Sequence, residues 1–249
     1  MNSIIDKLND HLLFQTFNTP DNKNETIDRY KFVASMYASI ENSIAVLSDL
    51  EHNRSFICYG ALASSLDLPV SYKEIDSIWE ENIYSIIHPD DLVMRHITEL
   101  RYFQFLKSIP AEERNKYHTY SIIRIRTKNQ NYMNIIHRTF FVESGENNSL
   151  WLALCLYGFS FDSEDLPCSF IVNSVNGTIM KDQNNKQLLS KREIEILRFI
   201  DSGKSSKEIS ELLSISLHTV NRHRQNIIER LRVSNSIEAV KIAKGMRIL

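Results

Sequence analysis

The chain has 249 residues, 43% of them hydrophobic, which is enough for two domains with a sizeable core. No apolar run approaches the roughly 20 residues of a membrane helix, and three cysteines, Cys58, Cys155 and Cys168, show no metal-ligand spacing, so we expect a cytoplasmic protein with free thiols and no metal. The net charge of −2 hides a basic end: residues 186–249 hold 13 Lys and Arg against 7 Asp and Glu, which leaves residues 1–185 at net −8.

Two amphipathic helices are expected first, over about residues 2–17 and 27–42, with a turn-rich segment from Asn18 to Asn24 between them. Such helices could cap a domain or pair two protomers. We assign residues 1–42 to an N-terminal helical extension.

Strands and helices then alternate in blocks. Short strands are expected over 44–50 and 54–59 around a turn at residues 51–53, and helices over about 72–87 and 90–106. His88-Pro89-Asp90-Asp91 opens the second of these helices, because proline and acidic residues suit a first helical turn. Three long strands, over 119–128, 132–142 and 150–159, form a predicted antiparallel meander.

Two strands, then helices, then three antiparallel strands is the element order of a PAS domain. The segment from Ile87 to Leu92 also resembles the His-Pro-Asp-Asp segment that many PAS domains carry before their last sheet. The resemblance covers about residues 42–161. It implies a PAS-like sensory or dimerisation domain, which we place at residues 43–161, with a sheet and helices that can enclose a small pocket.

The sequence identifies no ligand or cofactor for such a pocket. His88 and His96 are conceivable haem ligands, but histidines are more often ordinary polar residues, and the reactive-cysteine motif of flavin photoreceptors is absent. Aromatic residues at alternating strand positions either line the pocket or, more commonly, belong to the core or a dimer interface. They are Tyr132, Phe140, Trp151, Tyr157 and Phe159.

Residues 162–187 are predicted to form a short hairpin, with Asn176-Gly177 in its turn, followed by a polar interdomain linker. Residues 188–249 then form four predicted short helices with a trihelical core. Ser190 with Glu193, and Ser205 with Glu208, fit capping boxes that open the first two helices. Between them Gly203 ends the first helix.

In the second helix Ile209, Leu212 and Leu213 are expected to face inward. A tight turn at residues 214–216 leads to a third helix over 217–231, with Ser216 as its cap, and this is helix-turn-helix geometry.

The third helix has two different faces. Val220, Ile227 and Leu231 fall on one apolar stripe. The opposite face is polar, and its first turns carry side chains whose donors and acceptors suit base edges in a major groove. These are Asn221, Arg222 and Gln225, whereas Arg224, nearer the apolar border, is expected on phosphate.

These residues resemble the LuxR-type helix-turn-helix, which also ends many response regulators. The resemblance covers about 60 residues, including Arg192-Glu193, Gly203, Lys207-Glu208-Ile209, Ile215-Ser216, Thr219-Val220, His223, Ile227, Leu231 and Ala239. It implies that Lys207 and Thr219 approach phosphates and that the last helix, about 236–246, helps two copies pair on DNA. Gln225 stands where lysine is common in the family, which affects base preference, and Ser210 stands where alanine is usual.

We therefore predict an α+β chain that acts as a DNA-binding transcriptional regulator and not as an enzyme, since no nucleophile, base and orienting group occur at recognisable spacing. The expected partners are double-stranded DNA, a second copy of the chain, RNA polymerase and a small-molecule effector. A phosphoacceptor receiver or an acyl-homoserine-lactone domain does not fit the N-terminal pattern. The alternative is an adaptor whose PAS-like domain recruits a partner protein, with only non-specific DNA binding.

Overall fold

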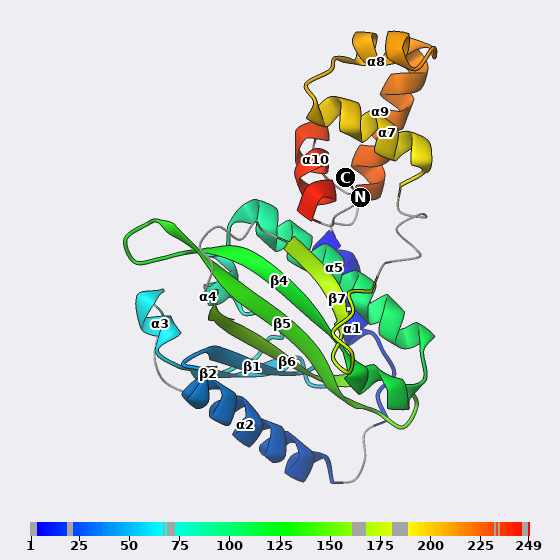
Figure 1. The fold of residues 1–249 in the computed structure, drawn as a ribbon. Helices are drawn as coiled ribbons and strands as arrows, with labels where there is room; N and C mark the ends of the chain where they lie inside the picture. Colours follow the sequence, from blue (N-terminus) through cyan, green and yellow to red (C-terminus); the bar gives the residue numbers. More distant parts are fainter. Residues whose placement is uncertain are drawn as a thin grey trace. The chain divides into compact units, whose positions relative to one another are not determined.

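The computed structural model describes residues 4–18, 22–66, 68, 73–160, 168–180, 189–231, 233, 235–245 and 249. The chain divides into two units, Met1–Ile179 and Met180–Leu249. The N-terminal unit combines an antiparallel sheet with helices and the C-terminal unit is helical, which confirms the α+β class (Figure 1). Among the described residues, no helix has both the length and the apolar character that crossing a bilayer requires.

A seven-stranded sheet, with the strand order β3-β2-β1-β6-β5-β4-β7, forms the centre of the N-terminal unit. Its middle joins β1 to β6, with Ile44 opposite Tyr157 and Asp49 opposite Leu152. The strands are β1 (Ile44–Asp49), β2 (Arg54–Tyr59), β3 (Lys73–Ile75), β4 (Tyr117–Arg126), β5 (Tyr132–Ser144), β6 (Leu150–Phe159) and β7 (Cys168–Asn173).

Helices cover both faces of this sheet, which explains why every residue of β1 is buried (Figure 1). On one face, Ala45 and Leu47 pack against α2 (Lys23–Ile40). On the other face, Ile44 and Val46 share a core with the short helices α3 (Leu62–Ser65) and α4 (Glu81–Tyr84). The long helix α5 (Pro89–Ser108) and the 3-10 helix η1 (Ala111–Lys116) complete the connection to β4.

The two N-terminal helices are integral to this unit. Leu8 and Leu12 of α1 (Ile4–Leu13) are buried with Tyr102 and Leu106 of α5, while α2 covers the opposite face of the sheet. A separate helical extension over 1–42 is therefore not what the structure shows, because both helices bury apolar side chains that the sheet would otherwise expose.

The segment predicted as a hairpin before the linker also joins the sheet. β7 pairs with β4 from Tyr117 opposite Asn173 to Ile122 opposite Cys168. The turn at Asn176-Gly177 is present, with Gly177 at a φ of +68°, so this part of the segment does fold back. Residues 161–167 and 181–188, which include most of the predicted linker, lie outside the described residues.

The prediction of one helix over 72–87 is wrong. The structure has instead the strand β3, whose Lys73 to Ile75 pair with β2, and the four-residue helix α4. The apolar spacing of Ile75, Ile78 and Ile83 resembles a helix, but the open edge of β2 offers backbone groups that β3 satisfies. Pairing at the sheet edge therefore decides the local structure.

The His-Pro-Asp-Asp segment fixes the start of α5 on β4. His88 is the N-cap, and its Nδ1 accepts a hydrogen bond from the Asp90 backbone at 3.3 Å. Asp91 accepts two hydrogen bonds from the Arg124 guanidinium, at 2.6 and 2.9 Å. His96 is buried against the rings of Trp79 and Tyr84, and burial lowers its pKa to about 3.

The strands β2-β1-β6-β5-β4 are adjacent and keep the chain order of two strands, helices and three strands on which the PAS resemblance rests. The assignment of this unit to the PAS domains stays a prediction. Cys58, Cys155 and Cys168 form no disulfide.

Four helices are described in the C-terminal unit: α7 (Lys191–Asp201), α8 (Ser206–Leu212), α9 (Leu217–Leu231) and α10 (Ser236–Gly245). The predicted stripe of α9, Val220, Ile227 and Leu231, is buried. The inward orientation predicted for Leu212 is wrong, since its side chain is 57% exposed. Ile209 is buried, and Leu213, the C-cap residue of this short helix, is half-buried.

Candidate nucleic-acid interface

Two capping boxes set the helices that precede the interface. Ser190 and Glu193 satisfy each other's backbone amides, with Glu193 Oε2 accepting from the Ser190 amide at 2.7 Å. Ser205 and Glu208 do the same at the start of α8, and the backbone amide of Ser205 lowers the pKa of the Glu208 carboxyl. Between them Gly203, with a φ of +80°, takes the left-handed conformation that ends α7. The sequence predicted all three features.

The turn between α8 and α9 has the geometry of a helix-turn-helix. Ser214 adopts a φ of +50°, and the next helix begins at Leu217. Ser216 Oγ accepts a hydrogen bond from the Thr219 amide at 3.0 Å and lies 2.8 Å from Thr219 Oγ1. Ser216 therefore caps α9, and the Thr219 hydroxyl is held at the start of that helix.

The solvent-facing side of α9 presents the side chains predicted to read bases. Asn221, Arg222 and Gln225 are all exposed. The Gln225 amide donates a hydrogen bond to Glu229 Oε1, one helical turn away, at 3.0 Å. This hydrogen bond must break before the Gln225 amide can donate to a base. Lys207 is exposed on α8, and Thr219 is half-buried.

Arg224 has a structural role that the sequence did not reveal. Its Nη1 donates to Ser206 Oγ at 2.8 Å, and its Nε donates to Ser236 Oγ at 3.2 Å. These hydrogen bonds connect α9 to the first residues of α8 and of α10. The prediction of a phosphate contact did not include this role, in which two nitrogens of the Arg224 guanidinium stabilise the packing of the helices.

A second brace links α7 to the far end of α9. Arg230 Nη1 donates to Glu193 Oε2 at 2.8 Å, and Glu193 is 1% exposed. Glu193 thus caps its own helix and accepts the arginine. The spacing of these residues along the sequence contained no signal for this contact, which only the packing of α7 on α9 creates.

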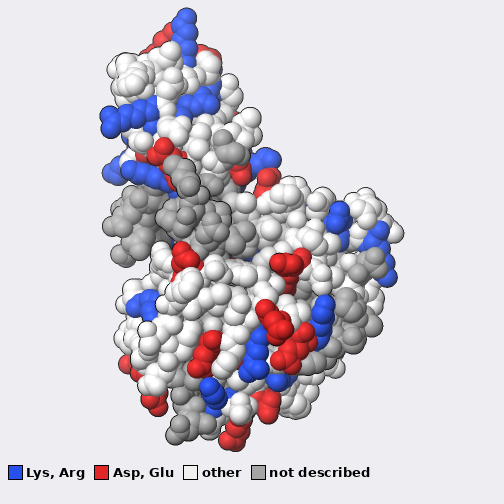
Figure 2. All heavy atoms as spheres, turned by 180° about the vertical axis from the view of Figure 1, so that it is seen from behind, with Lys and Arg blue, Asp and Glu red and all other residues white. Residues whose placement is uncertain are grey.

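Among the described residues the C-terminal unit holds ten Lys and Arg against seven Asp and Glu, so the basic excess predicted from the sequence is present there. On the face shown in Figure 2, basic and acidic side chains are visible on both units. A basic surface is what binding to a phosphate backbone requires.

One group of three metal-type ligands occurs among the described residues: Asp49, Glu51 and His52. Asp49 is buried and already accepts hydrogen bonds from the Trp151 indole at 3.0 Å and from Arg54 Nε at 3.1 Å. These contacts explain the group as an anchor of the β1–β2 turn.

Comparison with known proteins agrees with this geometry. The family model of the bacterial regulatory proteins of the luxR family matches residues 187–243. The C-terminal unit is a LuxR-type helix-turn-helix domain. The match covers α7, α8, α9 and most of α10. These are the four helices that the sequence resemblance predicted for this domain.

Curated relatives match part of the chain. It is 34% identical over 102 residues to the Fimbriae Z protein of Salmonella typhimurium, which is 41% of this chain and 46% of that protein. It is 36% identical over 88 residues to the uncharacterized response regulatory protein YgeK of Escherichia coli, 35% of this chain and 54% of that protein. The chain therefore spans about half the length of these relatives.

Solved structures with a likeness to the whole chain include the phage VqmA-DPO complex, with 9% identity, 90% of each chain covered and a TM-score of 0.31. Escherichia coli SdiA has 14% identity, 98% and 97% coverage and a TM-score of 0.27. These TM-scores are too low to show a shared fold.

Proposed function

We propose that this protein is a DNA-binding transcriptional regulator that reads the major groove with α9. The observation that carries the proposal is the exposed polar face of α9, with Asn221 and Arg222 free to meet base edges, in a domain of LuxR type. Lys207, Thr219 and Arg224 are the proposed phosphate contacts, and Gln225 is the third proposed base contact.

The N-terminal unit is proposed to be a PAS-like sensory or dimerisation domain that controls DNA binding. Its net charge of −8 disfavours contact with phosphates, so its influence must act through the presentation of the LuxR-type domain. We propose a homodimer on DNA, a location in the cytoplasm, and RNA polymerase and a small-molecule effector as further partners. The proposed role is regulatory and not enzymatic.

The test is a selection of duplexes from a random pool by the full chain, followed by affinity measurements at several salt concentrations. We expect one enriched motif with two-fold symmetry, because a single recognition helix covers only part of a helical turn. The affinity for that motif should fall steeply with salt as counterions return to the phosphates. Equal, weak binding of every sequence would instead favour an adaptor that recruits a partner protein.

A further inference from the structure

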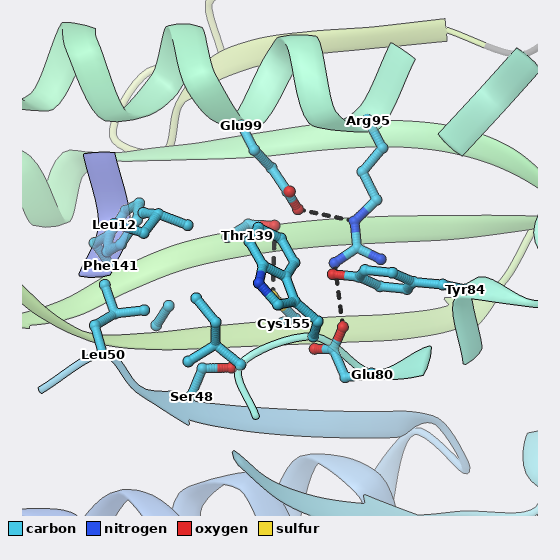
Figure 3. A pocket seen from close by; sticks show the side chains of 13 residues that line it. Leu12, Ser48, Leu50, Glu80, Tyr84, Arg95, Glu99, Thr139, Phe141 and Cys155 are labelled. Carbon is cyan, nitrogen blue, oxygen red and sulfur yellow. Dashed lines mark hydrogen bonds and ion pairs between the residues drawn. The ribbon is translucent and has the colours of Figure 1, made fainter. Parts of the chain in front are cut away.

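A cavity lies inside the N-terminal unit, between α5 and the face of the sheet that α5 covers (Figure 3). The space inside it that the centre of a water molecule can reach is about 40 Å³. One end is apolar and the other carries charged groups. The apolar end is formed by Leu12, Leu50, Ile78, Phe141 and Ala153.

The charged end is organised around Arg95, which is 2% exposed. Its Nε donates to Glu99 Oε1 at 2.8 Å, and its Nη1 donates to the Tyr157 hydroxyl at 2.6 Å. The guanidinium carbon lies 4.4 Å from the centre of the Tyr84 ring. Arg95 is therefore fixed in place and already neutralised by Glu99.

Glu80 borders the same end and is less well satisfied. Its Oε2 lies 3.6 Å from Arg95 Nη2, which is an ion-pair distance, and it accepts no hydrogen bond from any residue that the structure describes. The Glu80 side chain is 1% exposed. A buried carboxylate oxygen without a hydrogen bond is unfavourable, so a donor that enters the cavity would be stabilised there.

The Tyr84 hydroxyl lies beside the Glu80 carboxyl and lowers its pKa, against the effect of burial, and two further polar groups of the lining are already paired. Ser48 Oγ lies 3.0 Å from Ser55 Oγ, and Thr139 Oγ1 lies 3.7 Å from the Cys155 sulfur. The polar recognition of a ligand therefore falls to Glu80 and Arg95, and Figure 3 shows both side chains at the same end of the cavity.

Charge decides the class of ligand. An anion would add a third negative group to a buried site that holds one arginine and two glutamates, without a partner of its own. A cation would lie beside the buried guanidinium of Arg95, which repels it, and both carboxylates of the site already face that guanidinium. An uncharged head with one donor and one acceptor avoids both penalties.

We propose that this cavity binds a small uncharged molecule whose apolar body lies against Leu12 and Phe141 and whose polar head, of the carboxamide kind, donates to Glu80 and accepts from Arg95. Only the consequence of this binding, that the molecule is the effector of the regulator, rests on the proposed function. Binding itself is independent of DNA.

The probes are isobutyramide, isobutyrate and isobutylamine, which share a branched apolar body and differ in the charge of the head. Their affinities for the full chain are measured at pH 7 by nuclear magnetic resonance, with the indole signals of Trp79 and Trp151 as reporters. Trp79 lines the cavity, whereas Trp151 packs on the other face of the sheet. The Trp79→Phe variant assigns the two signals.

We expect isobutyramide to bind about tenfold more tightly than either charged probe and to shift the Trp79 signal without shifting that of Trp151. Equal or tighter binding of isobutyrate or isobutylamine overturns the proposal, and so does an unchanged Trp79 signal at saturating isobutyramide.

The Glu80→Gln variant tests the role of the carboxyl group. It keeps the shape and removes the charge, so discrimination against isobutyrate should fall about fivefold, whereas the exposed neighbour variant Glu81→Gln should keep it. Should Glu80→Gln not fold, Ala153→Val fills the apolar end and should abolish isobutyramide binding with Glu80 intact. Unchanged binding in both variants contradicts the site. DNA selection with the same preparation decides the proposed function separately.

Discussion

At the scale of single residues, Arg222 is the side chain on which sequence preference should depend most. It is exposed on the free face of α9, and a guanidinium can donate two parallel hydrogen bonds to a guanine edge. We expect Arg222→Ala to weaken binding to the selected duplex by about 1–3 kcal/mol and to relax preference at one base pair of each half-site. Affinities for the selected duplex and for single-base variants of it provide the measurement.

The matched control is Arg198→Ala, which removes the same charge from an exposed position of α7. It should leave the ranking of the duplexes unchanged. If Arg222→Ala weakened binding to every duplex by one factor, Arg222 would be a phosphate contact and the proposed base readout would have to be reassigned to Asn221 or Gln225.

Arg224 should affect stability as well as DNA binding. Its two hydrogen bonds join α8, α9 and α10, and hydrogen bonds from a charged donor are each worth about 1.5–3 kcal/mol when well buried. Because Arg224 is half-buried, we expect Arg224→Ala to lower the stability of the LuxR-type domain by about 1 kcal/mol. Amide hydrogen exchange in α8 and α10 measures this. Exchange as slow as in the parent chain would refute the bracing role, and Arg222→Ala serves as the comparison.

His96 should make the N-terminal unit sensitive to acid. Burial lowers its pKa from 6.5 to about 3, so below pH 6.5 the unfolded chain binds a proton that the folded chain does not. Stability from this group is therefore fully present above pH 6.5 and decreases as the pH falls toward 3, by up to about 1.4 kcal/mol per pH unit. Burial lowers the pKa of His137 too, which acts in the same direction.

The His96→Phe variant keeps a ring against Trp79 and Tyr84. When the pH is lowered from 7 to 5, we expect its free energy of unfolding to fall by about 2 kcal/mol less than that of the parent chain. Urea unfolding followed by tryptophan fluorescence reports this unit alone, because both tryptophans of the chain, Trp79 and Trp151, lie in it. The exposed His11→Phe variant should keep the parent pH dependence. A parent-like slope in His96→Phe would rule out His96 as the source.

At the scale of elements, α10 offers one exposed apolar residue for pairing two protomers. Ile237 is 70% exposed, whereas Ile242 is fully buried and Lys244 forms an ion pair with Asp201 at 2.7 Å. Ile242 belongs to the core of the domain, so substituting it would test folding and not pairing. Ile237→Glu should therefore reduce cooperative occupation of two half-sites by about tenfold and leave the domain folded.

The measurement compares binding to a duplex with two half-sites and to a duplex with one. Val175→Glu, at an aliphatic residue 73% exposed in the N-terminal unit, is the control for adding the same charge. An unchanged ratio between the two duplexes in Ile237→Glu would exclude α10 as the pairing surface.

The sequence predicted elements best where their signals were local. The capping boxes at Ser190 and Ser205, the stop at Gly203 and the buried stripe of α9 depend on residues within a few positions of one another. Contacts over long separations were invisible: Arg95 and Glu99 resemble an ordinary surface pair one helical turn apart, although both border the cavity. Glu80 and Tyr84 were not predicted as cavity residues either, because the sequence analysis placed them in a helix over 72–87 that the long-range pairing of β3 with β2 replaces.

At the scale of the whole molecule, the N-terminal unit should contribute affinity without contributing base contacts. A fragment of residues 184–249 keeps the described part of the LuxR-type domain and removes the unit of net charge −8. We expect it to select the same motif as the full chain with lower affinity, because the proposed contribution of the N-terminal unit to dimerisation, beside that of α10, is lost. Selection and titration of the fragment beside the full chain test this.

If the fragment bound as tightly and as selectively as the full chain, with or without isobutyramide, the N-terminal unit would have no control over DNA binding. Its role would then be the recruitment of a partner protein. A changed motif would instead mean that the N-terminal unit itself takes part in base recognition.

The pairing of β1 with β6 has a consequence for how the chain is made. β1 ends at Asp49 and β6 begins at Leu150, so roughly 100 residues separate two adjacent strands at the centre of the sheet. At about 5–20 residues per second, a ribosome needs about 5–20 s to supply the partner strand. During that interval the β1–β2 hairpin, apolar on both faces, has an open edge. The yield of folded protein should therefore depend on chaperones that cover this hairpin while synthesis continues.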